Sequence, residues 1–372
     1  MKGSEVHIVV VGGGLAGLVS SILLARYGHE VVLVEKKVYP FHRVCGEYIS
    51  NEVRDFLQRS NLLPTSIEFP AISKFVFSDT KGQLTSIPLD LGGFGLSRYV
   101  LDEWLVSQAK QTGVVVKAGV SVSDVQFIKA EDRFQIKLSN AETLISTHVI
   151  GAFGKRSVLD KVLDRPFMKQ RSPYIGVKYH VLADEDQDMV ALHNFNGGYC
   201  GINAIENGKF NLCYLGSRDQ LREFGSIPEL EQEVLWKNPV LKRIFQSSQF
   251  LFDKPEVINE INFEFKNPVE NHILMVGDAA GLITPLCGNG MAMAIRAGKM
   301  AAEAIHSETN RRKIEQGYAR TWNEEFKTRL WVGRKVQHLF GSGRSSGFAR
   351  RLIQYAPAVA QKVVKFTHGR PF

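Results

Sequence analysis

Three glycines near the start of the chain have the spacing that brings a phosphate group against a peptide backbone. Gly12, Gly14 and Gly17 form the pattern Gly-x-Gly-x-x-Gly between an apolar run and a helical pattern. The first glycine permits a tight turn, the second lets the backbone approach a pyrophosphate, and the third lets helix and strand pack closely. The N–H groups of Leu15 and Ala16 open that helix and favour an anion, because they have no partner within it.

An acidic residue follows at the distance that a ribose contact requires. Glu35 lies eighteen residues after Gly17, at the end of a second apolar run, where a carboxylate accepts hydrogen bonds from ribose hydroxyls. Lys36 follows it directly and is included among the candidate binding residues. The sequence therefore predicts an adenine dinucleotide site.

A second motif lies far downstream, where Gly277 and Asp278 follow the apolar run His272–Val276. This pair resembles the Gly-Asp motif of FAD-dependent oxidoreductases of the glutathione-reductase type. With the first motif, it makes the chain resemble the para-hydroxybenzoate hydroxylase fold, and most of all the geranylgeranyl reductase family, from Val6 to about Leu339. The resemblance implies FAD as the cofactor, with Gly277 and Asp278 at its ribityl chain.

A glycine-containing segment then precedes another helical pattern. Backbone N–H groups at such a helix start can stabilise the negative charge of a reduced flavin, and the family uses the corresponding loop in this way. The resemblance therefore implies that Pro285, Gly288, Asn289 and Gly290 contact the flavin.

Two further segments are similar to cofactor-binding parts of the family. Arg43, Cys45 and Gly46 resemble a loop near the flavin, and Arg98 resembles an arginine near the cofactor. Planar guanidinium groups suit pyrophosphate oxygens. The resemblance therefore implies that these four residues bind FAD.

Cys45 is the candidate catalytic residue. A thiol beside the flavin can donate a proton to a carbon atom as a hydride arrives, because hydride addition to a C=C bond leaves a carbanion-like centre. Packing as a small hydrophobic residue is the alternative interpretation. Phe153 stands where the family's Asp-Gly motif, which is linked to NAD(P)H handling, has its Asp.

The elements around these residues predict an α/β fold: a Rossmann-like FAD-binding domain with an inserted antiparallel-sheet substrate domain and a helical C-terminal tail. Short aromatic and β-branched runs separated by Asn-Gly turns predict the inserted sheet. Pro228–Phe245 is predicted to be helical, and the tail to hold two or three helices. The predicted boundaries assign residues 1–75, 98–160 and 266–306 to the FAD-binding domain, 76–97 and 161–265 to the substrate domain, and 307–372 to the basic helical region.

The net charge of +8 is unevenly distributed. Residues 307–372 contain 14 Lys/Arg and 4 Asp/Glu, a net charge of +10, so the other 306 residues sum to −2. Such a basic end could contact nucleic acid, an anionic membrane or an acidic protein, although a solvated helix face is the favoured interpretation. We expect no nucleic-acid partner and no bound metal, and we retain two hypotheses: peripheral membrane contact and an acidic carrier protein. On the helix pattern Ala319–Phe340, the apolar residues Trp322, Phe326, Leu330 and Phe340 carry the membrane hypothesis.

Four cysteines without disulfide or zinc spacing, and the lack of a visible signal peptide, lead us to expect a cytoplasmic protein. The leading functional hypothesis is reduction of a C=C bond in a hydrophobic, polyprenyl or polyketide-like substrate, with NAD(P)H as a candidate reductant. The alternatives are a monooxygenase or halogenase that uses a flavin C4a-hydroperoxide, and a redox-neutral flavoprotein of lycopene-cyclase-like type.

Overall fold

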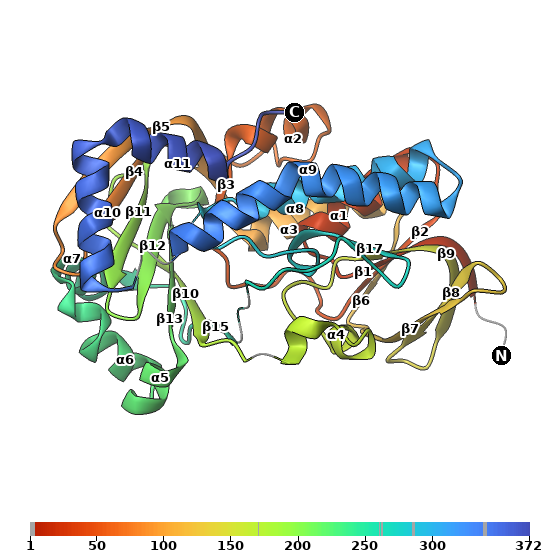
Figure 1. Cartoon of the computed structure of the whole chain (residues 1–372), viewed down its shortest axis with the longest axis horizontal. Helices are drawn as coiled ribbons and strands as arrows, with labels where there is room; N and C mark the ends of the chain where they lie inside the picture. The colour runs from red at the N-terminus through yellow and green to blue at the C-terminus, as the bar shows by residue number, and fades with distance from the viewer. Residues whose placement is uncertain (1–3, 170, 260, 262, 285–286, 338–340) are drawn as a thin grey trace.

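Two β-sheets lie side by side along the long axis of the molecule and define two domains (Figure 1). The computed structural model describes residues 4–169, 171–259, 261, 263–284, 287–337 and 341–372. The first sheet has strands from both ends of the chain, because the second is inserted within it. This is the mixed α/β architecture that the sequence predicts, and the fold prediction is confirmed.

The first domain is built on a parallel sheet whose central strand is β1. The strand order is β16-β17-β9-β1-β2-β6, with β7 and β8 joined to it through β9. Residues 8–11 of β1, 31–34 of β2 and 149–150 of β9 are buried and apolar, as expected for a sheet covered on both faces. The strand bounds are β1 (Ser4–Val11), β2 (Val31–Glu35), β6 (Val115–Ala118), β7 (Val122–Ile128), β8 (Arg133–Leu138), β9 (Thr143–Gly151), β16 (Val269–Glu270) and β17 (Ile273–Met275).

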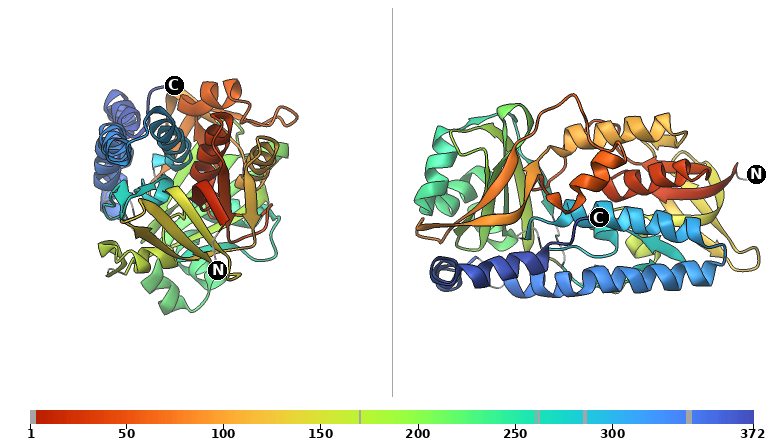
Figure 2. Two further views of the ribbon diagram at one scale, coloured as in Figure 1. Left: turned by 90° about the vertical axis from the view of Figure 1, so that its right-hand side faces the viewer. Right: turned by 90° about the horizontal axis from the view of Figure 1, so that it is seen from above.

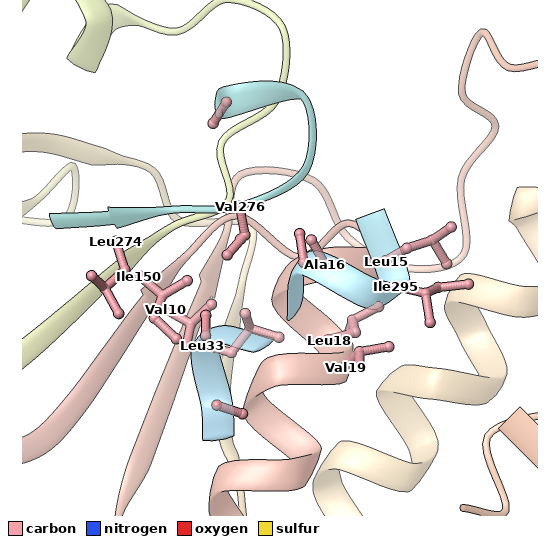
Figure 3. Close-up of a cluster of buried hydrophobic side chains, with 14 of the residues drawn as sticks. Val10, Leu15, Ala16, Leu18, Val19, Leu33, Ile150, Leu274, Val276 and Ile295 are labelled. Carbon is pink, nitrogen blue, oxygen red and sulfur yellow. The ribbon is translucent and has the colours of Figure 1, made fainter. Parts of the chain in front are cut away.

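Helices α1 (Leu15–Arg26), α3 (Arg98–Gln111) and α8 (Gly290–Ser307) pack on this sheet. Figure 3 shows side chains of the strands, such as Val10 and Leu33, meeting those of α1 and α8, such as Leu18 and Ile295. These contacts fix the start of α1 at the carboxyl end of β1.

The second domain is a nine-stranded sheet with the order β14-β10-β13-β12-β11-β4-β5-β3, and β15 pairs with β10. Among the described residues its pairs are antiparallel except β4 with β11, which is parallel. This sheet also contains β3 and the first residues of β4. These lie before residue 76, at which the predicted boundaries begin this domain. The strand bounds are β3 (Tyr48–Ser50), β4 (Ala71–Ser78), β5 (Leu84–Gly95), β10 (Tyr174–Leu182), β11 (Met189–Phe195), β12 (Gly198–Ala204), β13 (Phe210–Ser217), β14 (Gln249–Phe250) and β15 (Glu256–Asn259).

One face of the second sheet is covered by α5 (Arg218–Phe224), α6 (Ile227–Glu233) and α7 (Pro239–Ser247). The region Pro228–Phe245, which the sequence predicts to be helical, holds most of α6 and α7 with a break between them. The Asn238 side chain caps α7 and Pro239 occupies its first turn, which starts a new helix rather than continuing the old one. Two short helices lie elsewhere, α2 (Arg54–Arg59) and α4 (Val158–Val162).

Three helices form the C-terminal region, in agreement with the sequence. Helix α9 (Arg311–Gln337) runs from the first domain to the second, and α10 (Gly343–Tyr355) and α11 (Pro357–Thr367) then cover β4 and β5 (Figure 1). Trp322, Phe326 and Leu330 of α9 are buried in the core of the first domain and are not available to a membrane. Phe340 lies outside the described residues. Within the described part of the chain, no helix has the length and apolar character needed to span a bilayer.

Candidate functional site

The turn between β1 and α1 accepts only glycine at two of its positions. Gly12 has φ +107°, and a Cβ there would lie 2.3 Å from the carbonyl oxygen of Ala152. A Cβ on Gly17 would lie 2.0 Å from the carbonyl oxygen of Gly12. Helix α1 begins after Gly14, which provides no side-chain cap, so N–H groups of its first turn are left for a ligand.

Glu35 closes this turn from the end of β2. Its buried carboxylate accepts the N–H of Gly13 at 2.8 Å and that of Lys37 at 3.0 Å. These bonds orient the carboxylate beside the glycine turn, as a ribose contact requires. The side chain of Lys36, in contrast, is exposed to solvent.

Two arginines, Arg43 and Arg98, meet beside this turn. The carboxylate of Asp102, which was not among the predicted site residues, holds both of them. Arg98 donates to both oxygens of Asp102 at 2.7 and 2.8 Å, and Arg43 donates to Asp102 at 3.0 Å and to Glu35 at 3.2 Å. A Cβ on Gly14 would lie 3.6 Å from the Arg98 guanidinium. Burial alone would lower the pKa of Arg98, but the Asp102 charge raises it above its ordinary value. Two guanidinium groups therefore face the start of α1.

The downstream Gly-Asp motif lies next to this helix start. Gly277 has φ +59°, and a Cβ there would lie 3.2 Å from the Cβ of Ala16. The carbonyl oxygen of Asp278 accepts a hydrogen bond from Lys266 at 2.9 Å, and Lys266 also donates to the carbonyl of Lys155 at 2.8 Å. The structure thus brings together two motifs that are more than two hundred residues apart.

The start of α8 approaches from the other side. Gly288 has φ +63° and lines the cavity described below. The Asn289 side chain donates to Glu52 at 3.2 Å and to the carbonyl of Thr367 at 3.0 Å, whereas its buried Oδ1 has no hydrogen-bond partner among the described residues. Gly290 is the first residue of α8. Pro285 lies outside the described residues.

These observations fit FAD. An uncapped helix start with two guanidinium groups suits a pyrophosphate, and Glu35 at the end of β2 suits a ribose. Asp278 and the start of α8 lie where the ribityl chain and the ring would continue. The bound cofactor would therefore extend from β2 towards the second domain.

A cavity of about 250 Å³ lies where the two domains and the C-terminal helices meet. Its lining is mainly apolar. It includes Cys45, Gly46 and Gly288 on the cofactor side, Val190, Leu192, Tyr199, Cys213, Tyr214 and Leu215 from the second sheet, and Ala349, Leu352, Ile353, Ala360, Val363 and Val364 from α10 and α11. Such a space suits a hydrophobic ligand.

The loop that carries Cys45 is fixed by polar side chains of the second sheet. Asn211 of β13 donates to the carbonyl oxygens of Cys45 at 3.2 Å and Gly46 at 2.8 Å. Two other thiols line the cavity, and burial raises the pKa of Cys213 to about 12 and that of Cys287 to about 11. Cys45 is half-buried and is the thiol on the loop next to Arg43.

Glu47 anchors the end of this loop. It is fully buried, and its carboxylate accepts Lys178 at 2.5 Å, His180 at 2.6 Å and the N–H of Arg98 at 2.8 Å. Burial alone would raise its pKa, but the Lys178 charge and the His180 hydrogen bond lower it to about 2. No local spacing in the sequence indicates this cluster, because Lys178 lies 131 residues from Glu47.

The second sheet holds another histidine, His193 on β11. It is buried, 3.0 Å from Ser78 Oγ, and burial lowers its pKa to about 4. It does not line the cavity within the described part of the structure. This arrangement favours a structural role.

Comparisons with known proteins agree with this geometry. The sequence model of a family described as "FAD binding domain" matches residues 5–310. Digeranylgeranylglycerophospholipid reductase 2 of Methanopyrus kandleri is 27% identical over 355 residues, covering 90% of this chain and 87% of that protein. Menaquinone reductase of Mycolicibacterium smegmatis is 22% identical over 323 residues, covering 82% and 77%. The flavin-dependent brominase Bmp2 has a similar fold, with a TM-score of 0.76 at 18% identity, covering 98% of this chain and 93% of that one.

Proposed function

Because the chain belongs to the FAD binding domain family and is an FAD-dependent oxidoreductase, we propose that it reduces a C=C bond of a hydrophobic, polyprenyl or polyketide-like substrate. The observation that carries the proposal is the mainly apolar cavity between the Cys45 loop and the C-terminal helices. Two relatives support it, since their names state reduction of a digeranylgeranylglycerophospholipid and of a menaquinone.

The residues of this chain would divide the work between binding and proton transfer. The glycine turn, Glu35, Arg43, Arg98 and Asp278 would hold FAD, which in its reduced form supplies a hydride. The Cys45 thiol would donate a proton to the second carbon, so that the substrate gains two hydrogens. The apolar cavity walls would exclude water and orient the chain of the substrate. NAD(P)H is the proposed source of the electrons.

The test is anaerobic turnover. Purified holoenzyme is mixed with NADPH and a geranylgeranyl lipid or a menaquinone under argon, and products are identified by mass spectrometry. We expect a product heavier by two hydrogens and bleaching of the flavin absorbance. Turnover that requires oxygen would instead indicate a monooxygenase or halogenase, and a flavin that no donor or substrate bleaches would indicate redox-neutral chemistry.

Cys45 is tested in the same assay. Cys45→Ala should lower the rate of C=C reduction by roughly 10²-fold, a typical contribution of a positioned proton donor. Flavin content should stay unchanged. Cys213→Ala is the matched control, since it removes a thiol from the same cavity and should leave the rate near that of the wild type. Equal rates for both variants would remove Cys45 from the reaction.

A further inference from the structure

Helices α10 and α11 form a cover over the cavity, which we call the C-terminal lid. Ala349, Ile353 and Ala360 are buried on its inner face and pack against Phe77 and Ile87 of the second sheet. Other residues of the same inner face line the cavity directly. The lid is therefore the wall that separates a hydrophobic ligand in the cavity from the outside of the protein.

The outer face of the lid alternates large apolar side chains with cations. On α10, Arg344, Phe348, Arg351 and Tyr355 follow each other at intervals of four, three and four residues, which places them on one stripe of the helix. Phe348 is 59% exposed and Tyr355 is 76% exposed. Large apolar side chains exposed to this degree on one stripe mark an interaction surface rather than ordinary solvent contact.

Helix α11 repeats this arrangement. Val359, Lys362 and Phe366 are separated by three and four residues, and both apolar side chains are 50% exposed. Lys365 is exposed beside them. Together with the α10 stripe, these residues make up what we call the docking face.

The charge of this region has one sign. After Glu325 the chain contains no Asp or Glu as far as Phe372, whereas it contains the basic residues Lys327, Arg329, Arg334, Lys335, Arg344, Arg350, Arg351, Lys362, Lys365 and Arg370. Arg329 pairs with Glu52, and Arg350 pairs with Asp79. Among the described residues, the docking-face cations Arg344, Arg351, Lys362 and Lys365 form no ion pair. They therefore present uncompensated positive charge to a partner.

We propose that the docking face binds an anionic lipid bilayer, and that a lipid substrate enters the cavity through the C-terminal lid. Interfacial helices combine apolar side chains that enter the acyl boundary with cations that contact anionic headgroups. A bilayer satisfies both parts of the docking face, whereas an acidic protein would satisfy only its cations. Figure 2 shows α10 and α11 on the same side of the molecule as α9, so one flat partner could reach the whole lid. The identity of the cargo rests on the proposed function, but the docking itself does not.

The first test is sedimentation of the holoenzyme with vesicles. Vesicles of phosphatidylcholine alone are compared with vesicles that also contain phosphatidylglycerol, at low and at high salt. We expect binding that needs phosphatidylglycerol and weakens with salt, since polybasic attraction is screened. The triple variant R351E/K362E/K365E should bind more weakly by more than about tenfold, because it reverses three charges of the docking face.

A matched control changes the same net charge elsewhere. The variant K110E/K129E/K161E replaces three exposed lysines on α3, after β7 and on α4, in the first domain. It should bind phosphatidylglycerol vesicles like the wild type. Equal loss of binding in the two triple variants, or no binding of the wild type to either vesicle, would overturn the proposal.

A second measurement does not depend on charge reversal. Phe348→Trp places a fluorophore on the docking face. The difference between the emission of this variant and that of the wild type, which has four tryptophans, should shift to the blue with phosphatidylglycerol vesicles but not with phosphatidylcholine vesicles. An unchanged spectrum would overturn the proposal even if the protein sediments, because Phe348 would then remain in water.

Turnover separates this inference from the proposed function. The R351E/K362E/K365E variant should reduce a detergent-solubilised geranylgeranyl lipid at the wild-type rate and should be slower only when the lipid is embedded in vesicles. Vesicle binding without reduction of any double bond would refute the proposed function and leave docking intact. Reduction in detergent without vesicle binding would refute docking alone.

Discussion

Glu47 is the residue at which the cofactor loop, the second sheet and helix α3 are joined. It adopts φ +53°, which is unusual for a residue other than glycine, and such a conformation persists only where the surroundings determine it. Glu47 is held in this conformation by hydrogen bonds from Lys178, His180 and the N–H of Arg98. Because Cys45 lies only two residues before Glu47, the position of the thiol depends on this buried carboxylate.

Replacing Glu47 by Gln should therefore destabilise the protein. The variant leaves the Lys178 charge buried without its partner, a loss of about 3–5 kcal/mol for buried pairs. The pKa of Glu47 is lowered to about 2, so its contribution is present above the ordinary value near 4.5 and is lost as the pH falls towards 2. Urea denaturation at pH 7 and at pH 4 should show a difference between wild type and variant that is smaller at pH 4.

Glu142→Gln is the control for that experiment. Glu142 pairs with Lys117 at 2.9 Å, but both side chains are 27% exposed. A surface pair of this kind contributes about 0–1 kcal/mol. If E47Q and E142Q change the free energy of unfolding equally, the buried cluster does not fix the loop.

Glu231 should give the opposite dependence on pH. Its carboxylate accepts the hydroxyl groups of Tyr179 and Tyr214, both at 2.9 Å, and burial raises its pKa to about 7. The folded protein then holds a proton that the unfolded chain has lost, so stability falls from about pH 4.5 to pH 7, by at most about 1.4 kcal/mol per unit. Glu231→Gln should remove this slope in urea denaturation between pH 5 and 7, and identical slopes would show that Glu231 is ionised in the folded state.

Residue types and spacing predict part of the candidate site, but they do not predict the polar side chains that hold it in place. Gly12, Gly14 and Gly17 form a local motif whose backbone chemistry can be read from the sequence. Asp102 and Asn211 belong to no such motif. Asp102 contacts Arg43, 59 residues away in the sequence, and Asn211 contacts Cys45, 166 residues away. The Asn211 contact exists only once the second sheet has folded against the first domain.

At the scale of elements, the close contact between α1 and α8 sets the geometry of the cofactor site. A Cβ on Gly298 would lie 2.4 Å from the carbonyl oxygen of Ala16, so the two helices touch through backbone. Ala16 is the second residue of α1, so this contact lies in the first turn of the helix, next to the predicted pyrophosphate site. Any residue larger than glycine at this position must separate the two helices.

Gly298→Ala should therefore lower both the melting temperature and the flavin content of the purified protein. Alanine favours a helix over glycine by about 0.5–1 kcal/mol, so only the loss of packing can make the substitution unfavourable. Gly317→Ala in α9 is the control, because a Cβ there meets nothing within 4 Å, and it should raise stability slightly. A stabilising effect of both substitutions would show that α1 and α8 are less closely packed than the structure describes.

Periodicity predicts the individual elements better than their partners. Many strands of both sheets, such as β1 and β13, follow from apolar and β-branched runs, and the helices of the tail follow from helical spacing. The basic composition of residues 307–372 indicates a charged surface but does not locate it. Only the fold shows that Trp322 of α9 is buried, whereas Trp331 of α9 and Phe348 of α10 are exposed.

At the scale of the whole molecule, one buried carboxylate connects three distant parts of the chain. Glu52 accepts Asn289 at the start of α8, Arg329 in α9 and the N–H of Gly369 after α11. The end of the C-terminal lid is thereby tied to the loop that would face the flavin. Movement of the lid and order in the cofactor loop should consequently depend on each other.

Glu52→Gln tests this connection through limited proteolysis. The neutral side chain removes the ion pair between Arg329 and the buried Glu52 and weakens the hydrogen bond from the N–H of Gly369. The end of α11 should therefore separate more often from the rest of the protein. Trypsin should then cleave after Lys362 and Lys365 faster than in the wild type, as mass spectrometry of the fragments would show. Glu303→Gln removes a partly exposed partner of Lys299 and should leave the cleavage rate unchanged. If E52Q is cleaved at the wild-type rate, α11 is held by its apolar inner face alone, and the lid can open without disturbing the start of α8.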